Sequence, residues 1–80
     1  PAERLLAALD GTPTLGSVFG AKRRTRGLRL TATDVDWTWG QGPAVEGPGE
    51  ALLLTMLGRP HPLGELTGDG VAAFSARVRG

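Results

Sequence analysis

The side chains that could carry out chemistry in this chain of 80 residues are few. His61 is the only histidine, and there is no cysteine. A metal centre built by the chain alone would need two or three further ligands, and no second histidine or cysteine pair supplies them. Neither Ser17 nor Ser75 belongs to a motif that pairs a serine with a histidine. The sequence therefore predicts no catalytic residue and no metal ligand within this chain.

Arg59 is the best placed residue for contact with a ligand. It stands between Gly58 and Pro60, just after an apolar segment. A guanidinium held between a helix-capping glycine and a rigid proline could bind a carboxylate through two parallel hydrogen bonds. The alternative is that Arg59 only complements the negative end of the preceding helix. These residues alone leave both interpretations open.

Two indoles and an aspartate form a second candidate group. Trp37 and Trp39 flank Thr38, so both fall on one face of a strand. They could line an apolar ligand pocket, or they could pack in the core or at an interface, which we favour because an indole buries a large area. Asp34 and Asp36 could form a carboxylate pair beside them, although aspartate is common in turns. Asp34, Trp37 and Trp39 are therefore predicted as pocket or interface residues.

Positive charge is concentrated in one segment. Five of the nine basic residues lie between Lys22 and Arg29, in a chain of formal net charge +1. Such a segment could bind phosphate groups. However, no aromatic residue is interleaved with these arginines to stack on bases. We favour the interpretation that Arg24 and Arg26 lie on the solvated face of a strand, and we expect no nucleic-acid partner.

The elements that position these residues follow from the spacing of apolar side chains and from turn-forming residues. Short turns separate the predicted strands, and this pattern indicates an antiparallel meander. The fold class expected is α+β, a small antiparallel sheet of about three strands with helices packed on one face. The predicted order is a helix over Ala2–Leu9, a loop or irregular strand over Thr12–Lys22, strands over Arg26–Asp36, Trp37–Trp39 and Ala44–Glu46, a buried helix over Ala51–Leu57, a short extended piece or turn over Leu63–Leu66, and a last helix capped by Asp69.

Length and composition limit the number of domains and the expected location of the protein. Eighty residues make one domain, which we place at residues 1–80. The longest aliphatic run, Ala51–Leu54, has four residues, whereas a membrane span needs roughly 20. We therefore expect no membrane partner. The lack of cysteine fits a reducing compartment, and we expect a cytoplasmic protein.

Several segments together resemble a known family. These segments are Arg26-Gly27-Leu28-Arg29-Leu30-Thr31-Ala32-Thr33-Asp34-Val35-Asp36-Trp37, Gly42-Pro43-Ala44-Val45-Glu46-Gly47-Pro48, Ala51-Leu52-Leu53-Leu54, Gly58-Arg59-Pro60 and Leu66-Thr67-Gly68-Asp69-Gly70-Val71. Together they resemble the C-terminal domain of the mycothiol-dependent maleylpyruvate isomerase-like family of actinobacteria, over about residues 15 to 79. That domain is similar in fold to sterol carrier proteins.

The resemblance implies a partner and two cofactors. It implies an N-terminal DinB-like helical bundle of the same polypeptide, which holds a divalent metal and activates mycothiol. The present chain would then be the C-terminal domain of a longer protein and would help to close the site around a small-molecule substrate. Arg59 would contact a carboxylate of substrate or cofactor. The alternative function, suggested by the sterol-carrier-like order and the paired indoles, is a stand-alone carrier of a small lipid or apolar ligand.

Overall fold

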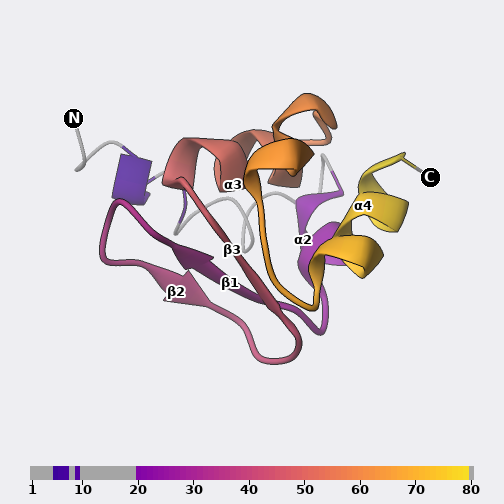
Figure 1. Cartoon of the computed structure of the whole chain (residues 1–80), viewed down its shortest axis with the longest axis horizontal. Helices are drawn as coiled ribbons and strands as arrows, with labels where there is room; N and C mark the ends of the chain where they lie inside the picture. Colours follow the sequence, from indigo (N-terminus) through magenta and orange to yellow (C-terminus); the bar gives the residue numbers. More distant parts are fainter. Residues whose placement is uncertain (1–4, 8, 10–19, 80) are drawn as a thin grey trace.

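The computed structural model of the chain describes residues 5–7, 9 and 20–79. Residues 5–7 and 9 are helical, in agreement with the helix predicted at the N-terminus. The rest of that helix, and most of the loop predicted over Thr12–Lys22, lie outside the described residues. The elements that follow are α2 (Ala21–Thr25), β1 (Arg29–Ala32), β2 (Thr38–Trp39), β3 (Ala44–Gly47), α3 (Gly49–Met56), the 3-10 helix η2 (His61–Glu65) and α4 (Val71–Arg79) (Figure 1).

The architecture is a three-stranded sheet with helices gathered on one side of it. In Figure 1 helix α3 lies above the strands, and α2 and α4 lie together at one end of the sheet. The α+β class and the three strands are thus confirmed. Within the described part of the chain, no helix is long and apolar enough to cross a membrane.

The directions of the strands differ from the prediction. The strand order is β2-β1-β3, so the first strand of the sequence lies in the middle. β2 pairs antiparallel with β1, with Leu30 opposite Trp39. β3 pairs parallel with β1, with Leu30 opposite Val45. The sheet is therefore mixed, and the prediction of an antiparallel meander is wrong for β3.

The reason is the path of the segment between β2 and β3. This segment does not turn back along β2 but crosses the start of β1, where the Arg29 N–H donates to the Pro43 carbonyl at 3.1 Å. Gly42 has a φ of 134°, and a Cβ there would lie 1.9 Å from the Gly27 carbonyl oxygen. Gly40 has a φ of 84° and is also pressed against backbone. The glycines thus serve a close crossing of two backbone segments and not a hairpin turn.

Helix α2 directly precedes the predicted strand over Arg26–Asp36, and the first three residues of that prediction are not in a strand. The chain is helical from Ala21 to Thr25, and β1 begins only at Arg29. The helix ends because Arg26 adopts an extended conformation and Gly27 has a φ of 73°. Arg24 therefore lies on a helix and not on the face of a strand.

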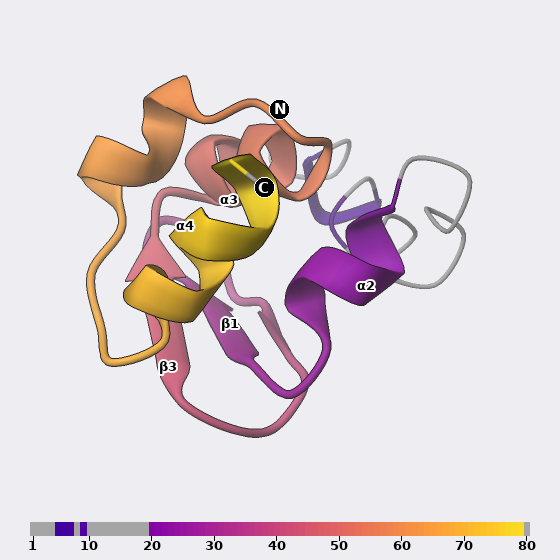
Figure 2. The same ribbon diagram turned by 90° about the vertical axis from the view of Figure 1, so that its right-hand side faces the viewer.

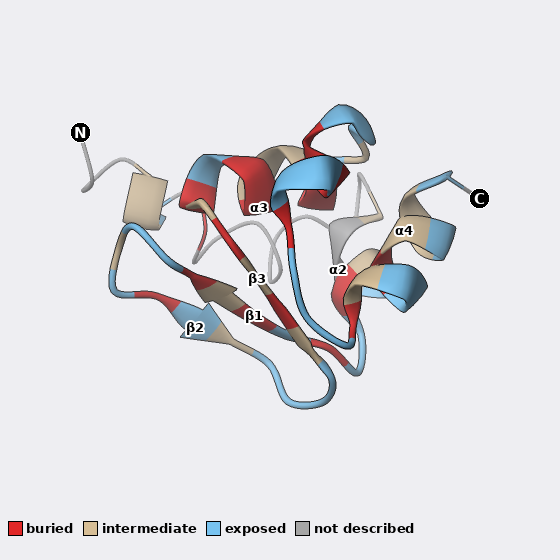
Figure 3. Ribbon diagram, viewed as in Figure 1, coloured by how far each residue is buried: buried red, intermediate tan, exposed pale blue. Residues whose placement is uncertain are grey.

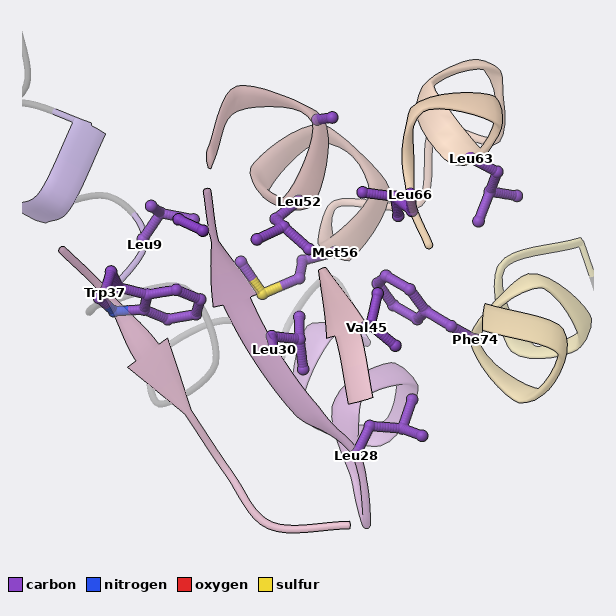
Figure 4. Close-up of a cluster of buried hydrophobic side chains, with 12 residues drawn as sticks. Leu9, Leu28, Leu30, Trp37, Val45, Leu52, Met56, Leu63, Leu66 and Phe74 are labelled. Atoms are coloured by element: carbon purple, nitrogen blue, oxygen red, sulfur yellow. The ribbon is translucent and has the colours of Figure 1, made fainter. Parts of the chain in front are cut away.

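The core lies between the sheet and the helices. Leu30 and Val45 on the inner face of the sheet are fully buried, as are Leu52 and Met56 of α3 and Phe74 of α4. Figure 4 shows the Met56 side chain directed from α3 toward Leu30, and Phe74 directed from α4 toward Val45. Figure 3 shows the same division, with buried positions along the inside of α3 and the strands.

The two connections after α3 complete the fold. Gly58 has a φ of 98° and ends α3 as predicted. The segment predicted to be extended or a turn forms η2 instead, with Pro62 and Leu63 buried. After η2, Thr67 forms an isolated antiparallel bridge with Glu46 at the outer edge of β3. Asp69, the predicted cap, is exposed and lies two positions before the first residue of α4.

Candidate functional site

Arg59 lies at the end of α3 with its side chain exposed. Its backbone N–H donates to the Leu54 carbonyl at 3.0 Å, while the Gly58 N–H donates to Thr55 at 3.0 Å. This pair of bonds is a Schellman motif, in which Gly58 takes the left-handed position. Among the described residues, no hydrogen bond or ion pair involves the Arg59 guanidinium. The motif fixes the backbone of Arg59, and the side chain remains exposed.

A carbonyl group at the C-terminal end of α3 instead accepts a hydrogen bond from the Arg24 side chain. The Arg24 Nη1 donates to the Met56 carbonyl at 3.0 Å from the neighbouring helix α2. The guanidinium is half-buried against two glycines, since a Cβ on Gly58 would lie 3.1 Å from it and one on Gly20 3.3 Å. A guanidinium at this place complements the negative end of the helix. The role that was the alternative for Arg59 is therefore occupied by Arg24, and the solvated position expected for Arg24 is wrong.

A small open cleft of about 280 Å³ lies beside the first turns of α3. α3 contributes Glu50, η2 contributes His61 and Glu65, and Asp34 comes from the connection between β1 and β2. The polar groups of the lining are thus three carboxylates and one imidazole. Such a lining favours a cationic or hydrogen-bond-donating ligand over a carboxylate. The remaining lining residues are Pro48, Ala51, Leu54 and Pro62.

Asp34 also has a structural contact. Its Oδ1 accepts a hydrogen bond of 2.8 Å from the backbone N–H of Gly49, the first residue of α3. A carboxylate at this place satisfies one of the free N–H groups at the start of a helix and complements its positive end. Asp34 therefore ties the β1–β2 connection to α3 at one edge of the cleft.

The indoles lie elsewhere. Trp37 is 7% exposed and belongs to the core, and Trp39 is half-buried and packs against the core. Thr38 between them is exposed, so both indoles do lie on one face, as predicted. Figure 4 shows Trp37 next to Leu9. The cleft lining includes neither indole and does not include Arg59, so the structure does not bring the four candidate residues together.

Sequence reasoning missed the cleft because its residues are assembled by η2. In the sequence His61 suggests only a possible metal ligand, and Glu50 suggests only a carboxylate that complements the start of a helix. The 3-10 helix places His61 and Glu65 beside the first turns of α3, and no spacing in the sequence indicates this contact. The run from Pro60 to Pro62 was the available signal, because proline favours the first positions of a helical turn.

The described residues do not fit a divalent metal. Across residues 5–7, 9 and 20–79, no three histidine, cysteine, aspartate or glutamate side chains come together as metal ligands would. Comparisons of the chain with protein-family models, with curated proteins and with solved structures find no match. The site is therefore defined by its own geometry: an exposed Arg59 at a rigid helix end, and a separate cleft with an acidic rim.

Proposed function

We propose that this chain is an accessory, non-catalytic domain of a two-domain enzyme that depends on a metal and a thiol. In this proposal it is the C-terminal domain of a mycothiol-dependent isomerase-like or transferase-like protein of the cytoplasm. It packs against an N-terminal DinB-like bundle and helps to close the active site around a small-molecule substrate. In this proposal the bundle holds both the metal and mycothiol; the metal is assigned there because the described residues of this chain do not form a group of metal ligands.

The observation that carries the proposal is that two arginines near the end of α3 have different roles. Arg24 satisfies the end of α3, so Arg59 is not needed there. Arg59 follows a Schellman motif that fixes its backbone, and its exposed guanidinium has no partner among the described residues. A guanidinium fixed at its base and free at its tip is suited to bind a carboxylate supplied from outside the domain. The segment Gly58-Arg59-Pro60 is also part of the resemblance described above.

The experiment begins with the coding sequence upstream of the Pro1 codon. The proposal expects it to encode a helical bundle with spaced histidines. The full polypeptide is then assayed for mycothiol-dependent turnover, and Arg59→Ala is expected to lower kcat/KM about tenfold to a hundredfold. Arg59→Lys should recover part of the loss, because it keeps the charge but not the two parallel bonds.

Arg79→Ala is the matched control, since Arg79 is also an exposed arginine but lies on α4. It should leave kcat/KM within about twofold of the unmodified protein. Equal kinetics for Arg59→Ala and the unmodified protein would remove Arg59 from the mechanism. An upstream sequence without such a bundle would contradict the two-domain assignment itself.

The structure gives less support to the alternative of a lipid carrier. A carrier needs an apolar pocket, whereas Trp37 is packed in the core and the cleft has a rim of carboxylates. No described feature favours that alternative over the accessory-domain proposal.

A further inference from the structure

Positive charge gathers on three elements that are neighbours in space. Seven of the nine lysines and arginines fall within residues 20–33 and 70–79, and none of the eight aspartates and glutamates does. These two segments contain α2, β1 and α4. Figure 2 shows α2 and α4 side by side. The Arg77 Nη1 joins them by donating to the carbonyls of Arg24 and Arg26. The sequence thus concentrates positive charge on two adjacent helices.

Two of these arginines have an internal role and the others do not. Arg24 binds the end of α3, and Arg77 binds the end of α2. Three exposed arginines, on or directly beside α2 and α4, form what we call the arginine face. Within the described residues, the only hydrogen bond of their side chains is a 3.3 Å contact from one of them to Ser75, and none has an ion pair. The members of the arginine face are Arg23, Arg26 and Arg79. Arg29 of β1 is exposed as well, but it alternates with the buried Leu30 and therefore lies on the outer face of the sheet, away from these helices.

Three of the six described acidic side chains lie at the other end of α3, and the other three, Asp36, Glu46 and Asp69, form no ion pair with the described arginines. Arg24 contacts the C-terminal end of this helix, whereas Asp34 contacts its N-terminal end. Glu50 and Glu65 line the cleft on the same side as Asp34. An α-helix of eight residues is about 12 Å long, so α3 separates the two charges by more than a screening length at physiological salt, which is about 8 Å. The arginine face therefore carries a local positive field, although the net charge of the chain is only +1.

We infer that the arginine face docks an acidic surface of a protein partner. Exposed like charges repel one another, so a cluster without internal counterions stabilises neither α2 nor α4. Arginine is enriched at protein interfaces and binds carboxylates in pairs of hydrogen bonds. Stacking on nucleic-acid bases would need aromatic side chains at the surface, but of the aromatic residues that the structure describes, Trp37 and Phe74 are buried and Trp39 packs against the core. The inference rests on the charges of this chain and not on the proposed function, so either can fail without the other.

The test measures binding of the full 80-residue chain to fluorescently labelled poly-L-glutamate by anisotropy. Saturable binding that weakens as salt rises is expected. The double variant R23Q/R26Q should bind about tenfold more weakly, because two exposed charge contacts are lost. T33E/T67E is the matched control, since it changes the net charge by the same two units at exposed positions outside the arginine face. It should bind within about threefold of the unmodified chain.

Three outcomes would overturn the inference. They are an equal loss of affinity in both double variants, binding that does not respond to salt, and tighter binding of a DNA duplex of equal charge than of poly-L-glutamate. The last outcome would identify phosphate as the ligand. Circular dichroism checks that the variants are folded. If R23Q/R26Q is not, R23Q/R79Q replaces it, with the same tenfold loss expected because these two exposed residues belong to the same face.

Discussion

Two arginines close to the end of α3 illustrate how position decides the role of a side chain. Arg24 is 32 residues away from Met56 in sequence but donates to its carbonyl. Arg59 is only three residues away from Met56, yet its backbone alone takes part in the helix end. A hydrogen bond from a charged donor to a helix end stabilises the fold by about 1–2 kcal/mol. Evolutionary change at Arg24 should therefore affect folding, and change at Arg59 should affect binding.

A prediction at this scale concerns Asp34. Replacing it with alanine removes the acceptor of the Gly49 N–H, so the free energy of unfolding should fall by about 1 kcal/mol. Urea denaturation followed by tryptophan fluorescence measures the change. Asp36→Ala is the control, because Asp36 is an exposed aspartate of the same connection without a hydrogen bond to the described residues. It should change the free energy by less than about 0.5 kcal/mol, and equal effects of the two variants would show that the Asp34 contact is not stabilising.

The glycine crossing gives a second prediction. Gly42→Ala would bring a methyl group onto the Gly27 carbonyl and strain a backbone with φ of 134°. We expect a loss of about 3 kcal/mol or more, a large part of the total stability of a domain of this size, which is roughly 4–12 kcal/mol. Gly64→Ala is the matched control, since a Cβ there meets no atom within 4 Å. Thermal unfolding followed by circular dichroism should show a lower midpoint for Gly42→Ala than for Gly64→Ala. A Gly42→Ala variant as stable as the unmodified chain would contradict the close approach of Gly42 to the Gly27 carbonyl.

At the scale of elements, the pairing of α2 with α4 depends on one side chain. The Arg77 Nη1 binds two carbonyls at the end of α2, at Arg24 and Arg26. We expect Arg77→Ala to lower the free energy of unfolding by about 1–2 kcal/mol, with the upper end reduced by solvent exposure. In Arg79→Ala only a contact with Ser75 in the same helix is lost, so the change should stay below about 0.5 kcal/mol. Urea titration measures the free energy of unfolding of both variants. Similar midpoints would show that the two hydrogen bonds from Arg77 to α2 contribute little to stability.

Local patterns predicted the elements that depend on local sequence. α3 and α4 were found because apolar residues recur at helical spacing and a glycine ends α3. β3 was found within one residue. α2 was not predicted because a run of charged residues has no apolar period; its first residues were assigned to a loop or irregular strand, and Arg24 was assigned to the face of a strand.

The features that were not predicted depend on contacts between distant segments. The direction of β3 follows from the approach of Gly42 to Gly27, which short-range turn rules do not contain. The cleft requires η2 to lie beside α3, and Arg24 was assigned to solvent because its partner Met56 is on another helix. For the candidate residues, the sequence indicated the exposed Arg59 and the packing of the indoles, but not which side chains meet.

For the whole molecule, the two indoles report on how closed the core is. A chain that keeps only Trp39 (W37F) should be quenched by acrylamide roughly twofold more than one that keeps only Trp37 (W39F), because Trp39 is half-buried and Trp37 buried. The fluorescence of the unmodified chain should not change on addition of a fatty acid. A saturable change would instead support the lipid-carrier alternative.

The bridge between Glu46 and Thr67 has a consequence for how this molecule can associate. Its two hydrogen bonds of 2.8 Å occupy the backbone at the outer edge of β3, and the opposite edge is formed by β2, which has only two residues. Growth of a sheet by adding a foreign strand needs a longer row of free N–H and C=O groups. The described part of the sheet therefore offers no long edge to a foreign strand, and we expect contacts with other molecules at this sheet to be made through side chains.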